Sequence, residues 1–251
     1  MKLSKKFLIS SILILSCAFT FAQTDVEEVE TSVESDYLND MMAETISAMA
    51  HSDDLATKLE AVNYLKNAVE SGNTSQSIID TLDDMAGEGI TRENRENGRI
   101  MNNFPQIRRE ACLILGEVPT IHSKNTLIQI AKEDKEPMVG AAAVQALGNI
   151  AVEIDRVDES IDAISFFQKN NMVMNPTSSY AMEVLFAYEK LIDHASPEMK
   201  RKILEDITAI YGNPNYHNGL VEKKAFQLLM EYGGIGGKKN NKKTNTEVSE
   251  K

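Results

Sequence analysis

The fold of this chain is decided by the stretch Arg108-Arg109-Glu110-Ala111-Cys112-Leu113-Ile114-Leu115-Gly116. The same pattern returns 32 positions later as Gly140-Ala141-Ala142-Ala143-Val144-Gln145-Ala146-Leu147-Gly148. Weaker copies are centred on Ala61, Ala181 and Ala225. Repeats of this length are typical of stacked helical hairpins, because one hairpin cannot bury its apolar face alone. We therefore expect a helical stack whose surface serves interaction.

Aligning the five copies on their central alanine shows which positions face the core. Four residues after the alanine, every copy has a leucine: Leu65, Leu115, Leu147, Leu185 and Leu229. Steps of three and four between apolar residues indicate one buried face on each helix. Second apolar segments, at 78–85, 127–130, 161–167 and 203–210, lie between the copies and complete each hairpin.

Local signals mark where the helices are expected to begin. Proline is favoured in the first turn, so Pro105, Pro137 and Pro197 indicate three helix starts. Short polar side chains cap helices well. The expected N-caps are Asp53, Asn73, Ser123, Asp158 and Ser196.

Two copies resemble the HEAT repeats, in their short bacterial HEAT-like form. They are the stretches that begin at Pro105 and Pro137, and both follow the family's Pro-x-Val-Arg, Ala, Ala-Leu-Gly order, with Gly140 in place of the usual Arg. The other copies keep Ala and Leu but lose the terminal Gly. The resemblance implies an all-α, right-handed α–α superhelix of about four and a half hairpins that binds proteins. An armadillo-like superhelix would fit the same pattern.

An export signal is expected over residues 1–22. Three lysines (Lys2, Lys5 and Lys6) precede an apolar run, and Thr20-Phe21-Ala22 offers small residues for cleavage after Ala22. The apolar run is shorter than the roughly 20 residues that span a bilayer. We therefore expect a periplasmic or secreted protein with no membrane span in the mature chain.

A lipid anchor is the alternative for this segment. Cys17 follows Ile14-Leu15-Ser16, which resembles a bacterial lipoprotein box. Leu15 is bulkier than the residue usual there. If Cys17 leaves with the signal, Cys112 remains alone, and we expect it to be a small buried apolar residue.

Composition divides the remainder of the chain. Residues 23–36 are expected to be an acidic flexible leader, 37–232 the HEAT-like repeat domain with a capping helix at 37–49, and 233–251 a disordered Lys-rich tail. The formal net charge is −12. A body this acidic repels phosphate backbones, so we do not expect a nucleic-acid partner.

A basic surface is the candidate binding site. The long segment 87–103 is expected to be a loop; it carries Arg92, Arg95 and Arg99, and Arg108 and Arg109 follow it. Inserted loops on one face of a repeat stack often bind partners. We therefore expect these arginines to contact a protein or peptide of the cell envelope. The other interpretation is a solvated loop, with the helix arginines paired to Glu or Asp across repeats.

Motifs for catalysis are mostly absent, so we expect a scaffold that is not an enzyme and has no cofactor or metal. No His forms a His-x-x-x-His pair or precedes Glu. Chromophore lyases with related repeats stay open, although export counts against them. The alternative function is an enzyme or a small-ligand or metal-binding protein, with a site assembled across repeats from Tyr188, His194, Tyr211 and His217.

Overall fold

The computed structural model describes residues 33–91, 93–216 and 219–234. The chain forms two compact units, Met1–Asp40 and Met41–Lys251. The export signal with its cleavage after Ala22, the cysteine Cys17, most of the acidic leader and most of the Lys-rich tail lie outside the described residues.

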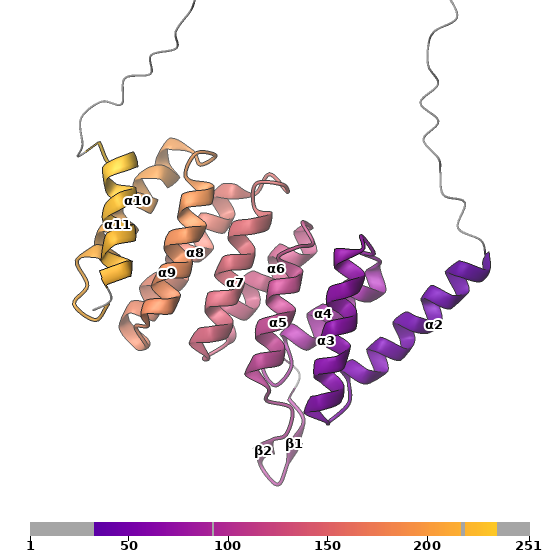
Figure 1. Ribbon diagram of the computed structural model, residues 1–251. Coiled ribbons are helices and arrows are strands. Elements are labelled where there is room, and N and C mark those ends of the chain that lie inside the picture. The colour runs from indigo at the N-terminus through magenta and orange to yellow at the C-terminus, as the bar shows by residue number, and fades with distance from the viewer. Residues whose placement is uncertain (1–32, 92, 217–218, 235–251) are drawn as a thin grey trace, which may run out of the picture. The chain divides into compact units, whose positions relative to one another are not determined.

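Within the described residues the second unit is built of helical hairpins with one small β-hairpin (Figure 1). The helix α2 (Val33–Ala50) begins four residues before the expected position 37. The hairpins then follow in chain order as α3 (Leu55–Glu70) with α4 (Gln76–Ala86), α5 (Pro105–Leu115) with α6 (Ile121–Glu133), α7 (Pro137–Ile150) with α8 (Val157–Met174), α9 (Ser178–Leu191) with α10 (Pro197–Tyr211), and α11 (Gly219–Tyr232) alone. The strands β1 (Arg95–Glu96) and β2 (Arg99–Ile100) lie between α4 and α5.

The helices stand in two rows. The first row contains α3, α5, α7, α9 and α11, and the second row, behind it in Figure 1, contains α4, α6, α8 and α10. The predicted all-α repeat stack is confirmed. Connections from a second-row helix to the next first-row helix all reach the same edge of the stack, because first-row helices run parallel to one another. We call this the loop edge; its segments are 87–104, 134–136 and 175–177.

The predicted core columns are buried. All five column alanines have 0 % exposure, and the five column leucines are buried as well. First-row helices approach most closely where the repeat ends in glycine. A Cβ on Gly116 would lie 2.8 Å from Ala146 Cα, and a Cβ on Gly148 would lie 3.0 Å from Ala187 Cα. The terminal glycine of the repeat is therefore required by helix contact rather than by a turn.

Cys112 lies in the core, as expected. Cys112 is fully buried in α5, and burial raises the pKa of its thiol, as suits a small apolar residue rather than a reactive group.

Among the described residues, none of the helices has an apolar stretch sufficient to traverse a bilayer.

Candidate functional site

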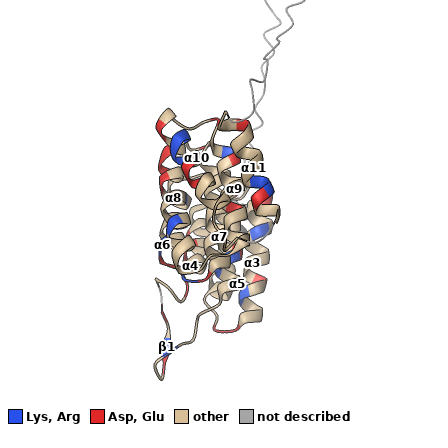
Figure 2. Ribbon diagram, turned by 90° about the vertical axis from the view of Figure 1, so that its left-hand side faces the viewer, with Lys and Arg blue, Asp and Glu red and all other residues tan. Residues whose placement is uncertain are grey.

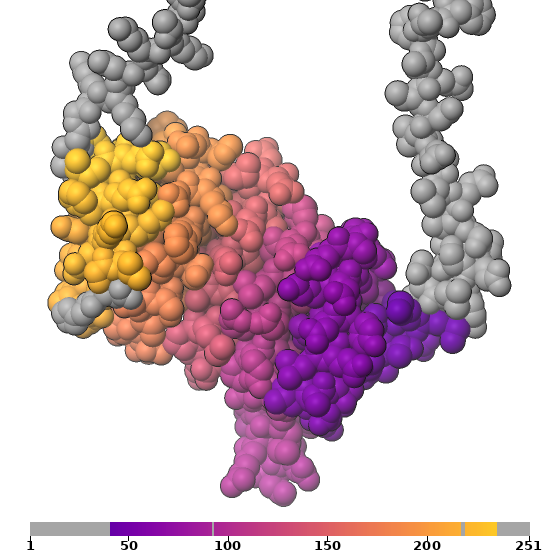
Figure 3. All heavy atoms as spheres, viewed as in Figure 1, coloured from indigo at the N-terminus to yellow at the C-terminus, as the bar shows by residue number. Residues whose placement is uncertain are grey.

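A two-stranded hairpin projects from the loop edge between α4 and α5 (Figure 3). Its strands pair antiparallel, with Arg95 opposite Ile100 and Glu96 opposite Arg99. Asn97 and Gly98 form the turn with φ of 49° and 81°, which a tight hairpin turn requires and which Asn-Gly adopts most readily. Residues 93–99 are all exposed. The segment expected to be a loop thus holds a defined protruding element.

The base of this hairpin is fixed by buried polar groups. The Asn102 side chain is buried and accepts a hydrogen bond from the Asn94 N–H at 2.8 Å, and the Met101 N–H donates to the Asn94 carbonyl at 2.8 Å. Gly89 adopts a φ of +72°, and a Cβ there would lie 2.6 Å from the Asn102 carbonyl oxygen. Only glycine allows the two ends of the segment to approach so closely.

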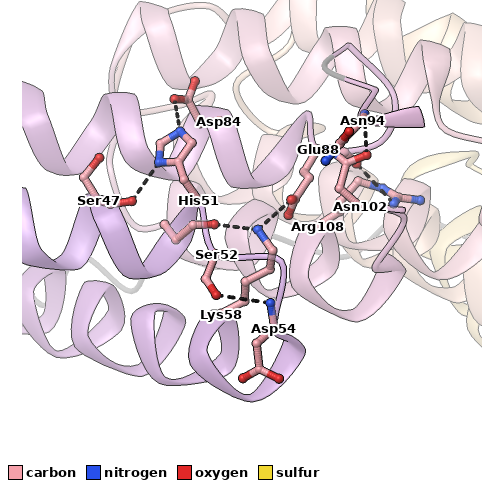
Figure 4. A network of polar contacts seen from close by, with 11 residues as sticks. Ser47, His51, Ser52, Asp54, Lys58, Asp84, Glu88, Asn94, Asn102 and Arg108 are labelled. Atoms are coloured by element: carbon pink, nitrogen blue, oxygen red, sulfur yellow. Dashed lines mark hydrogen bonds and ion pairs between the residues drawn. The ribbon is translucent and has the colours of Figure 1, made fainter. Parts of the chain in front are cut away.

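Below the hairpin, two buried cations pair with carboxylates from neighbouring segments, and Figure 4 shows the pair of Lys58 and Glu88. Lys58 Nζ lies 2.6 Å from Glu88 Oε1 and donates to the Ala50 carbonyl at 2.6 Å. Burial raises the pKa of the Glu88 carboxyl, and the hydrogen bond and charge of Lys58 oppose that shift. The pair joins α3 to the start of the hairpin segment.

Arg108 makes the second buried pair. Its Nε lies 2.6 Å from Asp134 Oδ2, and both side chains are only 1 % exposed. Its Nη1 donates to Asn103 Oδ1 at 2.8 Å and to the Glu88 carbonyl at 3.3 Å. One guanidinium therefore ties α5 both to the base of the hairpin and to the end of α6.

These contacts correct the expected basic surface. Arg108 is buried and cannot present its guanidinium to a partner, because Asp134 from the next loop covers it. Arg109 pairs with Glu110, and Arg95 with Glu93 at 2.6 Å. Only Arg108 is thereby removed from the expected surface, because Arg109 and Arg95 remain exposed beside their acidic partners. Lys and Arg lie interspersed with Asp and Glu in Figure 2.

The other two arginines of the expected surface, Arg92 and Arg99, belong to the segment 87–103 that contains the hairpin. Arg99 is exposed on β2, opposite Glu96. Arg92 lies outside the described residues. Contact of Arg92, Arg95, Arg99 or Arg109 with a partner stays a prediction.

The two buried cations occupy the same repeat position. Lys58 and Arg108 each stand three residues before the column alanine, and their carboxylates follow the second helix of the same hairpin. In the third hairpin this position is Gly140, and α8 ends at the C-cap Asn175 instead of a carboxylate. The series of buried ion pairs therefore stops at α7.

A cavity of about 460 Å³ opens where the series stops. We call it the Gly140 cavity; its walls include Asp134, Gly140, Phe167, Asn171, Met174 and Tyr180. A Cβ on Gly140 would lie 3.0 Å from Tyr180 Cε2, so the tyrosine ring packs directly on the glycine. The side-chain oxygen Asn171 Oδ1 is buried and has no hydrogen-bond partner among the described residues.

The alternative Tyr and His site is not assembled in the described residues. Tyr188 is buried and donates to Asp206 Oδ2 at 2.7 Å, whereas His194 is exposed. Tyr211 packs against Phe226 with ring centroids 6.1 Å apart, and His217 lies outside the described part of the chain. Over the described ranges, three or more His, Cys, Asp or Glu side chains do not gather as metal ligands would.

Sequence reasoning missed most of this edge. The Asn97-Gly98 pair is a strong hairpin signal and could have been recognised. A cation three residues before the column alanine, at Lys58 and Arg108, could have indicated a buried series. The identity of the partners Glu88 and Asp134, and the Gly140 cavity, had no local signal.

No protein-family model matches this chain, and no curated protein matches it in sequence. Among solved structures, the chain is similar to one in the complex of CpcE and CpcF of phycocyanin lyase from Nostoc sp. PCC7120. The two are 15 % identical with a TM-score of 0.37, and the match covers 76 % of this chain and 87 % of that chain.

This comparison corrects one expectation. We expected that this protein is not an enzyme; the similar chain comes from the complex of a phycocyanin lyase, so that expectation is withdrawn. Helical repeats by themselves do not exclude catalysis, because chemistry depends on side chains at a site and not on the fold. The chain is a helical-repeat protein of the all-α class.

Proposed function

We propose that the protein is an exported helical-repeat scaffold that binds a protein or peptide partner of the cell envelope along its loop edge. The observation that carries this proposal is the exposed hairpin fixed from below by buried polar groups. Residues 93–99 place no side chain in the core. Ordering them costs conformational entropy, roughly 1–2 kcal/mol per residue. A protruding element held in place at such a cost serves recognition better than stability.

The chemistry of the hairpin suits a polar partner with an apolar contact. Arg95 and Arg99 alternate with Glu93 and Glu96, so the hairpin offers both signs of charge. Met101, at its base, is a large exposed apolar side chain. Mixed charges arranged in a fixed geometry give specificity more than affinity. A partner with matching charges on an extended segment fits this surface.

Export is part of the proposal, and residues 1–22 support it. Three lysines, an apolar run and small residues before Gln23 form the pattern of a cleaved signal. Mass spectrometry of the mature protein is expected to find Gln23 at its amino terminus. A lipidated Cys17 would mean a tethered scaffold, and an intact Met1 would contradict export.

Binding is tested by photocrosslinking in the native cell envelope. A photoreactive amino acid in place of Arg99 is expected to capture one defined protein, and the same substitution at exposed Lys66 on α3 is the control. Charge reversal by Arg95→Glu and Arg99→Glu should reduce capture from a probe at Met101. Equal capture at Arg99 and Lys66, or capture of no protein, would contradict binding at the loop edge.

A further inference from the structure

The first-row helices contact one another through two defined faces. Gly116 lies five residues after the column alanine of α5, and a Cβ on it would lie 2.8 Å from Ala146 Cα in α7. Gly148 occupies the same position in α7 and approaches Ala187 of α9 in the same way. We call the side that carries Gly116 and Gly148 the forward face, and the side that carries Ala146 and Ala187 the backward face. Each of these forward faces packs on the backward face of the next helix in the row.

The forward face of α11 carries exposed apolar side chains. Among the described residues, no helix follows α11. Met230 stands five residues after its column alanine, and Phe226 lies one turn earlier on the same side. The residues equivalent to Phe226 in α5 and α7, Cys112 and Val144, are fully buried. By contrast, Phe226 is 49 % exposed and Met230 37 %. The ring of Tyr211 packs beside Phe226 and is exposed as well.

The backward face of α3, at the other end of the row in Figure 1, is also only partly covered. Tyr64 stands three residues after the column alanine, as Ala146 does in α7, and it is exposed, whereas Ala146 is fully buried. Between Tyr64 and α2 lies an apolar groove of about 260 Å³, which we call the Tyr64 groove. A cavity of about 150 Å³ holds a benzene ring, so this groove has room for an aromatic side chain. The side chains of α2 that line it are Met41, Met42, Thr45, Ile46 and Met49.

The repeat indicates what covers these two surfaces. Repeat stacks ordinarily end in capping repeats with polar outer faces, because an apolar end is left in contact with water. In this chain both the forward face of α11 and the backward face of α3 are apolar. Within the row, forward faces pack on backward faces. A second copy of the same chain therefore supplies the surface that each end lacks.

The forward face of α11 carries a positive charge. Lys223 is exposed three residues before Phe226, on the same side of the helix. The acidic residues of α11 stand at other positions of the repeat, with Glu222 toward the loop edge and Glu231 on the backward face. An acidic surface therefore complements this end of the stack.

The other end of the row is acidic. Glu60 is exposed on α3, and the Tyr64 hydroxyl donates to its Oε1 at 3.5 Å. In the sequence, residues 24–57 contain ten Asp and Glu and no Lys or Arg, whereas residues 233–251 contain five Lys and two Glu. Two identical ends repel each other and two unlike ends attract, which favours a head-to-tail contact.

We propose that the forward face of α11 binds the backward face of α3 in a second copy, so that molecules join head to tail. Phe226 enters the Tyr64 groove of the second copy, and Met230 lies against Tyr64, as Gly116 lies against Ala146 in the contact of α5 with α7. Such a contact is heterologous, so the assembly extends as a filament or closes into a ring. This inference goes beyond the proposed function and does not depend on binding at the loop edge.

The first test follows the molar mass of the protein, as isolated from cells, by sedimentation at rising concentration. The wild type is expected to form dimers and longer species. Phe226→Glu blocks the forward face and Tyr64→Glu the backward face, and each should weaken association by about tenfold to a hundredfold, as the loss of one buried aromatic side chain does. Phe166→Glu, at an exposed phenylalanine of α8, is the matched control and should associate like the wild type. A wild type that stays monomeric at every concentration would overturn the proposal.

Mixing the two blocked variants tests the head-to-tail arrangement. The variant Phe226→Glu keeps its backward face, and Tyr64→Glu keeps its forward face. An equimolar mixture is therefore expected to form dimers that grow no further, although each variant is monomeric by itself. Equal melting temperatures for both variants and the wild type check that the exposed substitutions leave the fold intact. Association through two identical ends would leave one variant dimeric alone, and that result would refute the arrangement.

A disulfide test reports the register of the contact. By equivalence with Gly116 and Ala146, Met230 of one copy lies next to Tyr64 of the second copy. A mixture of Met230→Cys and Tyr64→Cys should form a crosslinked dimer under mild oxidation, and neither variant should do so alone. Cys112 is buried and does not compete. Crosslinking within either variant alone, or none in the mixture, would contradict the proposed contact.

Discussion

The second and third hairpins carry the same repeat but close the loop edge differently. In α5 and α6 the edge is sealed by the buried pair of Arg108 and Asp134. In α7 and α8 the corresponding residues are Gly140 and Asn175, and a cavity remains. Both hairpins bury their column alanine and leucine completely. The columns that build the stack are therefore independent of the position that closes its edge.

The largest expected effect comes from opening the sealed edge. Arg108→Leu leaves the Asp134 carboxylate buried without a cation and should lower the free energy of unfolding by about 3–5 kcal/mol. Urea denaturation measures this loss. The neighbouring change Arg109→Leu, which removes an exposed pair with Glu110, should cost under about 1 kcal/mol. Equal losses would show that the buried pair of Arg108 and Asp134 stabilises the fold no more than the exposed pair of Arg109 and Glu110.

We expect the column leucines of the second and third hairpins to contribute similarly to the free energy of unfolding. Leu115→Ala and Leu147→Ala each remove a fully buried side chain and should each cost about 2–5 kcal/mol. Thermal melting followed by circular dichroism measures the two variants side by side. Melting near that of the wild type for both would mean that the leucine column is not the core of the stack.

A smaller difference in stability is expected between alanine substitutions at two glycines, one at the contact of α5 with α7 and one beside the cavity. Gly116→Ala places a Cβ 2.8 Å from Ala146 Cα, and the overpacked helices should lose about 1–3 kcal/mol. Gly140→Ala meets only the edge of the Tyr180 ring, at 3.0 Å, and alanine favours helix over glycine. The second variant should therefore lose less. A greater loss at Gly140 would mean that the cavity side of α7 is as tightly packed as the contact between α5 and α7.

The smallest expected effect is a pH dependence of the free energy of unfolding, which comes from Glu88 in the buried pair of the first hairpin. Burial raises the pKa of Glu88 in the folded protein above its value in the unfolded chain. Between these two values the folded state holds more protons, so the stability that Glu88 contributes is present below the unfolded pKa and is lost as pH rises through the folded pKa. Urea denaturation at several pH values should show wild-type stability falling relative to Glu88→Gln over this window. A constant difference between the two proteins would contradict the raised pKa.

Local sequence signals predicted the helices better than their exact starts. The prolines at 105, 137 and 197 and the cap Ser196 stand where expected. Asp54 caps α3 instead of Asp53, and Thr120 caps α6 instead of Ser123. In both cases two suitable side chains lie within three residues of each other, and only the path of the backbone decides which one reaches the free N–H groups.

The sequence by itself determined the all-α stack, because the spacing of Ala and Leu along each copy already fixes which helix face must leave water. Only the tertiary structure decided the loop edge. Arg108 and Asp134 are 26 residues apart in the chain, and the cavity beside Gly140 is walled by residues from the helices α6 to α9 and from the loops between them. These contacts depend on how the packed helices place side chains that are distant in the sequence. The periodicity within a single helix does not predict them.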